Sequence, residues 1–198
     1  MRELLSSYGI PVGSLPKISG RYTGGCIVCA DGACIWNDLE RFGCRSRNAV
    51  EKYGWDFITV NRLVEVFPGR IDHAYSNSGA VLNRFIAARR QEYINEFPIV
   101  TTHSRDTETD WKWPLNGGGT SGLGAILVAL GLGYSHVVLA GMPLDNGPHN
   151  GEPPWRTTSF TTEAQDGDTH WQRAIALAFR GRVKSLSGRT REWLGEPS

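Results

Sequence analysis

Residues 117–122 (GGGTSG) combine the residue types that bind an anion at the start of a helix. The glycines are followed by Thr120 and Ser121, which can cap a helix, then by Gly122 and the apolar run 123–130. A helix that begins here directs unpaired N–H groups and the positive end of its dipole toward a bound phosphate, and glycine lets a ligand approach the backbone. A glycine-rich turn that only packs a helix on a sheet has the same sequence, so the pattern leaves both interpretations open.

His170 lies where a general base is expected. The helix predicted from this region opens with a capping box formed by Thr169 and Gln172. The positive end of the helix dipole disfavours a charged imidazole, so the ring can stay neutral and accept a proton. A partly exposed histidine beside a helix cap is the alternative. The remaining histidines have no such placement and are expected to be structural or to face solvent: His73, His103, His136 and His149.

Two further charged residues lie in predicted loops. Residues 142–165 are rich in Pro, Gly, Asn and Thr, and a loop of this length inside a domain is usually functional, so we interpret it as a lid. Within it, Arg156 beside Trp155 is a candidate to bind a phosphate, although surface Arg–Trp pairs are common. Asp31 follows the first predicted strand, where its carboxylate could accept from a ribose hydroxyl or a base amine, hold a metal, or cap the next helix.

The elements that must position these residues alternate between strand and helix. Strands are predicted at 26–30, 57–60, 71–76, 98–102, at a Val/Leu segment ending at Gly141, and at 183–186; helices are predicted at 35–42, about 81–93, from Thr120, from Thr169, and at 190–194. This alternation predicts one Rossmann-like α/β domain, with a mainly parallel sheet, helices on both faces and a lid loop. Ligands bind such sheets at the carboxyl ends of the strands, where several polar residues fall: Asp31, Asn61, Ser76, Asn77 and Thr120.

Length and charge limit the remaining possibilities. The 198 residues fit one domain, which we place at 24–198 after an N-terminal arm at 1–23. The formal net charge is +1 with both signs interspersed, so no footprint for duplex nucleic acid is expected. No apolar run is long enough for a transmembrane segment, and the first residues lack the apolar core of a signal peptide. A cytoplasmic location follows as an expectation; a homo-oligomer is compatible with the sequence, which leaves the oligomeric state open.

The cysteines do not predict a metal centre. Cys26 and Cys29 have the spacing of a metal clip, but they lie in a predicted strand, where positions three apart point to opposite faces. Together with Cys34 and Cys44, they are therefore expected to be free thiols in a reducing compartment, with no metal-binding residues assigned.

Several of these stretches, taken in order, resemble the bacterial lipooligosaccharide sialyltransferases and the related Rossmann-like proteins that include a pterin pyrophosphokinase. The resemblance covers roughly residues 24–195 and includes the turn after the first strand, the polar ends of the next two strands, the TSG helix, the strand ending at Gly141, the lid, and the histidine after it. It implies that a cytidine nucleotide of a CMP-sugar is surrounded by Asp31, Gly32, Asn61, Asn77 or Ser76, Thr120, Ser121 and Gly122. It also implies that His170 is the general base.

The chain departs from that family at several places, one of which is that no basic residue immediately precedes Thr120. The first turn reads ADGAC where the family typically has GNGPS, Pro143 stands where related proteins commonly carry an acid, and no tyrosine follows Tyr134 to replace the lid tyrosines of the family. A nucleotide pocket tolerates these differences better than sialyl-transfer chemistry does.

The leading hypothesis is therefore a nucleotide-sugar-dependent glycosyltransferase, which needs no cofactor, with His170 deprotonating the hydroxyl of an unidentified acceptor. One alternative is an ATP-dependent pyrophosphokinase, which requires Mg²⁺ and would use Asp31 and Asp145. Another is a protein that binds or sequesters a nucleotide without catalysis.

Overall fold

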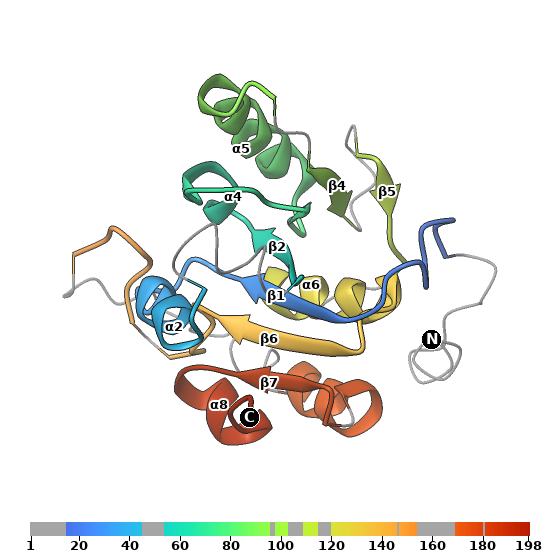
Figure 1. The fold of residues 1–198 in the computed structure, drawn as a ribbon, viewed down its shortest axis with the longest axis vertical. Coiled ribbons are helices and arrows are strands. Elements are labelled where there is room, and N and C mark those ends of the chain that lie inside the picture. Colours follow the sequence, from blue (N-terminus) through green and yellow to red (C-terminus); the bar gives the residue numbers. More distant parts are fainter. Residues whose placement is uncertain are drawn as a thin grey trace.

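A computed structural model describes residues 15–44, 54–95, 98–102, 109–114, 120–145, 147–153, 169–179 and 181–198. Within these residues, seven strands form one sheet in the order β5-β4-β3-β2-β1-β6-β7 (Figure 1). Every pair of neighbouring strands is parallel, which confirms the predicted α/β fold. The strands are β1 (Gly25–Cys29), β2 (Asp56–Val60), β3 (His73–Tyr75), β4 (Ile99–Thr102), β5 (Trp111–Lys112), β6 (His136–Ala140) and β7 (Val183–Ser185).

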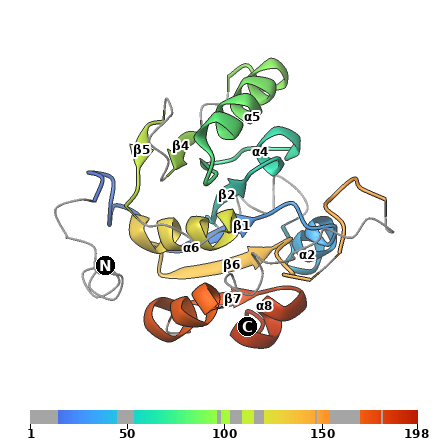
Figure 2. The same ribbon diagram turned by 180° about the vertical axis from the view of Figure 1, so that it is seen from behind.

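Helices cover both faces of the sheet. On one face, α6 (Ser121–Leu132) and the helical segment 169–179, which ends in a π-helical turn at Ile175–Phe179, pack on β1, β2 and β6. On the other face lie α2 (Ile35–Arg41), α4 (Leu63–Val66) and α5 (Gly79–Glu92). The last helix, α8 (Gly188–Leu194), follows β7 at the sheet edge. Figure 2, seen from behind, has α6 in front of the sheet.

The central strand β1 lies in the hydrophobic core. All of its residues are buried, as expected for a parallel strand that is covered on both faces. Cys26 packs in the core beneath α6, whereas Cys29 packs in the core beneath α2, so the two thiols lie on opposite faces as predicted. All the cysteines are free. Among the described residues, no group of three or more Cys, His, Asp or Glu side chains is arranged to hold a metal.

The order of the strands creates a switch point at β1. The chain moves outward from β1 through β2, β3 and β4 to β5, and then α6 carries it back so that β6 pairs with the other side of β1. The connection after β1 leads to α2 on one face of the sheet, whereas the connection after β6 leads to the helical segment 169–179 on the other face. Ligands bind such sheets beyond the carboxyl ends of the strands at a switch point of this kind. The predicted polar residues lie along this edge.

Two elements were missed by the sequence pattern. The helix α4 has four residues and the strand β5 has two, and both are too short to show a period.

The described part of the predicted arm, 15–23, is held to the end of α6: the Gly20 and Tyr22 N–H groups donate to the Gly131 and Leu132 carbonyls, 3.1 and 3.0 Å away. In the part of the chain that the structure describes, no helix has the length and hydrophobicity needed to cross a bilayer.

Candidate functional site

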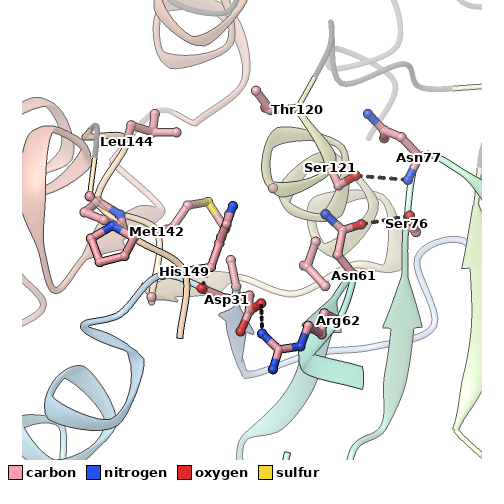
Figure 3. Close-up of a pocket in the computed structure, with 18 of the residues that line it drawn as sticks. Asp31, Asn61, Arg62, Ser76, Asn77, Thr120, Ser121, Met142, Leu144 and His149 are labelled. Atoms are coloured by element: carbon pink, nitrogen blue, oxygen red, sulfur yellow. Dashed lines mark hydrogen bonds and ion pairs between the residues drawn. The ribbon is translucent and has the colours of Figure 1, made fainter. Parts of the chain in front are cut away.

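A cavity of about 600 Å³ lies at the carboxyl ends of β1, β2, β3 and β6 (Figure 3). It is lined by all the predicted nucleotide-binding residues that the structure describes: Asp31, Gly32, Asn61, Ser76, Asn77, Thr120, Ser121 and Gly122. They come from the turns after three different strands and from the start of α6. Parallel strands all end at the same edge, so residues far apart in sequence converge there.

The two remaining predicted site residues, Arg156 and His170, have different outcomes. Arg156 lies outside the described residues, as does much of the predicted lid, namely 146 and 154–165. His170 is described: it is exposed at the start of the helical segment 169–179 and is not among the residues that line the cavity, although its neighbour Trp171 is.

Asn61 is held with its amide nitrogen toward the cavity. Its backbone is left-handed, with φ of 55°, a conformation that asparagine tolerates better than most residues. The Ser76 hydroxyl donates to Asn61 Oδ1 at 2.8 Å. Because the oxygen is the acceptor in this bond, the Asn61 NH₂ group is the end that faces the cavity in Figure 3.

Asn77 is oriented in the same way by a different hydroxyl. Tyr75 donates its phenolic proton to Asn77 Oδ1 at 2.9 Å, so the NH₂ group is again the free end. The Asn77 backbone N–H donates to Ser121 Oγ at 3.2 Å, which joins the end of β3 to the first turn of α6. Both asparagines thus present donors on the side of the cavity that carries the α6 N-terminus.

The start of α6 is capped as predicted. Thr120 is the N-cap residue, and its Oγ1 accepts from the Leu123 N–H at 3.3 Å. The same oxygen accepts from Trp171 Nε1 at 3.2 Å, which ties the helical segment 169–179 to the cavity wall. A Cβ at Gly122 would lie 2.7 Å from the Met142 sulfur, so this glycine allows close packing against Met142 rather than simply leaving room for a ligand.

Asp31 supplies the acceptor on the opposite side of the cavity. Its side chain is only 10% exposed; Oδ2 lies 3.7 Å from Arg62 Nη1, and Oδ1 has no hydrogen-bond partner among the described residues. Burial raises the pKa of this carboxyl group, and the charges of Arg62 and His149 oppose that rise. The N-cap of α2 is Cys34, without a side-chain capping bond, so Asp31 does not cap this helix.

The segment after β6 packs against the turn after β1. Gly32 N–H donates to the Gly141 carbonyl at 2.9 Å, and Asn150 N–H donates to the Asp31 carbonyl at 2.8 Å. A Cβ at Gly32 would lie 2.6 Å from the Gly141 oxygen, so glycine is needed for this approach. The first part of the predicted lid is therefore fixed to the cavity wall by backbone hydrogen bonds.

Arg62 and His149 are among the cavity-lining residues that sequence reasoning did not assign to the site. Arg62 donates to the Asn150 carbonyl at 2.9 Å and directly follows Asn61, so its position after a strand was a usable signal. His149 was expected to be structural or solvent-facing. It is exposed, as one of these expectations has it, but it also lines the cavity, where an isolated bridge pairs it with Gly32.

Comparisons with known proteins give one informative match. No family model and no curated protein matches the chain. A solved structure, the MAf glycosyltransferase from Magnetospirillum magneticum AMB-1, superposes with a TM-score of 0.53 at 16% sequence identity. The match covers 83% of this chain and 32% of that one, so this chain spans about a third of the length of its structural neighbour. At this level of identity the comparison shows a shared fold.

Proposed function

We propose that this chain is a nucleotide-sugar-dependent glycosyltransferase, similar in chemistry to the sialyltransferases. The observation that carries the proposal is the convergence of Asn61, Asn77 and Ser121 on one side of a single cavity, facing Asp31. Amide donors and a helix N-terminus suit the phosphate of a nucleotide, and a carboxylate suits ribose hydroxyls or a base amine. The fold shared with a glycosyltransferase supports the same reading.

The reaction requires a group that accepts the proton of the acceptor hydroxyl. The resemblance of the sequence to the sialyltransferases assigns this role to His170. It lies beside Trp171, whose indole lines the cavity and donates to Thr120, so the start of this helical segment is linked to the nucleotide side of the site. The acceptor would enter over the rim from solvent, which His170 faces.

The alternatives predict different ligands. A pyrophosphokinase would bind ATP with Mg²⁺, and Asp31 and Asp145 both line the cavity. The Asp145 side chain accepts from the Gly147 N–H at 2.9 Å and is exposed, so it belongs to a local turn. A nucleotide-sequestering protein would bind the nucleotide but would not release it from a nucleotide-sugar by catalysis.

Calorimetry and thermal melting with CMP, CDP and ATP, each with and without Mg²⁺, distinguish these functions. We expect CMP or CDP to raise the melting temperature without metal, because a ligand that binds only the folded state stabilises it. A sugar transferase should then release CMP from a CMP-sugar in the presence of an acceptor. Stabilisation by ATP that depends on Mg²⁺ would instead support the pyrophosphokinase, and CMP binding without turnover of any CMP-sugar would support sequestration.

A further inference from the structure

His149 has a fixed position at the rim of the cavity. The antiparallel bridge between His149 and Gly32 is flanked by two hydrogen bonds, from Ala33 N–H to the Pro148 carbonyl and from Asn150 N–H to the Asp31 carbonyl, at 3.2 and 2.8 Å. The His149 N–H donates to Glu152 Oε2 at 3.1 Å. The backbone on both sides of the imidazole is therefore anchored to the turn that follows β1.

The imidazole of His149 is held in one tautomer. Its Nδ1 lies 3.3 Å from the backbone oxygen of Asp31, which can only accept a hydrogen bond. In this bond Nδ1 must carry the proton, so the neutral ring has its lone pair on Nε2. A ring nitrogen with a free lone pair, on an exposed side chain that lines the cavity, has the arrangement of a general base.

Asp31, whose backbone oxygen contacts the imidazole, also lines the cavity. Its side chain is largely buried, and the charge of His149 opposes the rise in the pKa of the Asp31 carboxyl group that burial causes. Figure 3 draws Asp31 and His149 together, across the cavity from Asn61, Ser76 and Asn77.

We propose that His149 is the general base of the transferase, with Asp31 as a positioning residue whose backbone carbonyl fixes the orientation of the ring. The acceptor hydroxyl oxygen bonds to the anomeric carbon, while the bond from that carbon to the phosphate oxygen breaks and its electron pair leaves with the nucleotide. The acceptor proton moves to His149 Nε2 and then passes to solvent. This assignment rests on the proposed glycosyl transfer and replaces the role that the sequence resemblance gives to His170.

The two histidines differ in their relation to the cavity. His149 lines it and is anchored to the turn that carries Asp31, whereas His170 does not line it. The acceptor must reach both the base and the anomeric carbon, so a base on the cavity rim satisfies the geometry of proton transfer more directly.

The test compares His149→Asn with His149→Ala, and His170→Ala measures the competing assignment of the general base in the same assay. Asparagine keeps an N–H donor for the Asp31 carbonyl but has no basic nitrogen, so it separates anchoring from proton transfer. We expect kcat for CMP release from CMP-N-acetylneuraminic acid, with galactoside acceptors, to fall about a hundredfold or more in both His149 variants. CMP affinity measured by calorimetry should stay within about threefold, and added imidazole should restore part of the turnover of His149→Ala.

A second measurement does not require turnover. In NMR spectra of the wild-type protein with labelled histidine, CMP should shift the ring signals of His149 and leave those of His170 nearly unchanged. The proposal is overturned if His149→Asn, shown to be folded by circular dichroism, keeps wild-type kcat, or if CMP binds without any shift at His149. A wild-type protein that binds CMP but never releases it from a donor contradicts the glycosyl-transfer function itself, and with it the role of His149.

Discussion

The hydroxyl of Tyr75 occupies the space that a side chain at Gly124 would need. A Cβ built at Gly124 overlaps this hydroxyl, and both residues are buried, one at the end of β3 and the other in α6. The same hydroxyl orients the amide of Asn77. Because Gly124 has no side chain, the Tyr75 hydroxyl can occupy the position from which it orients the Asn77 amide.

Replacing Gly124 by alanine should therefore harm both stability and binding. We expect Gly124→Ala to lower the free energy of unfolding by about 1–3 kcal/mol, as is typical of overpacked cores, and to weaken CMP binding because Asn77 loses its fixed orientation. Chemical denaturation and calorimetry measure the two effects. In the double variant with Tyr75→Phe, part of the stability should return while CMP binding stays weak. Full recovery of binding would show that the Tyr75 hydroxyl does not orient Asn77.

Two substitutions of Asn61 separate the effect of its side-chain amide from the effect of its backbone conformation. Asn61→Gly removes the amide but adopts a φ of 55° readily, whereas Asn61→Ala removes the same amide and must strain the backbone. Both variants should weaken CMP binding by a similar factor, on the order of tenfold for a lost hydrogen bond to a charged group. Asn61→Ala should be less stable than Asn61→Gly by about 1 kcal/mol in urea denaturation. Unchanged CMP affinity in both would remove Asn61 from the site.

The buried histidine of β3 should make stability depend on pH. His73 Nε2 bonds to the Tyr134 hydroxyl at 3.1 Å, which in turn donates to Asp56 Oδ2 at 2.5 Å. Burial lowers the pKa of His73 to about 4, from 6.5. The unfolded chain therefore binds a proton more readily than the folded protein, and stability should fall as the pH drops from about 6.5 to about 4. The loss is of order 3 kcal/mol, because one pKa unit corresponds to about 1.4 kcal/mol.

His73→Gln provides the control for this prediction, because the glutamine amide can still donate to the Tyr134 hydroxyl but does not titrate. Urea denaturation of both proteins at several pH values should show that the wild-type protein loses more of its free energy of unfolding than the variant does as the pH falls through this window. Parallel curves for the two proteins would mean that other groups cause the acid sensitivity.

The sequence predicts that residues 142–165 act as a lid, and the structure indicates which part of this segment proteolysis should test. Residues 148–150 are hydrogen-bonded to the turn after β1, so cleavage is not expected there. Arg156 lies just beyond them and provides a trypsin site. If the lid closes over a bound nucleotide, saturating CMP should slow cleavage after Arg156 by at least several-fold, as followed by mass spectrometry. Equal rates with and without CMP, under conditions where calorimetry shows binding, would contradict a lid.

Much of the site could be predicted from local sequence. The alternation of short apolar runs and helical stripes predicts a parallel sheet, and in such a sheet the residues that follow each strand meet at one edge. Asp31, Asn61 and Asn77 follow strands in this way, and Thr120 has the residue type and position of an N-cap, so their convergence needed only the correct strand assignments.

The tertiary structure alone decided which of the loops are neighbours. The pairing of β6 with β1 rather than with β5 places the segment after β6 against Asp31. His149, which has no distinctive position in the sequence, therefore lies at the rim of the cavity. It also decided that Gly124 leaves room for Tyr75. Local sequence does not encode these contacts, because strand order depends on how whole faces of the sheet are buried by helices that are distant in the chain.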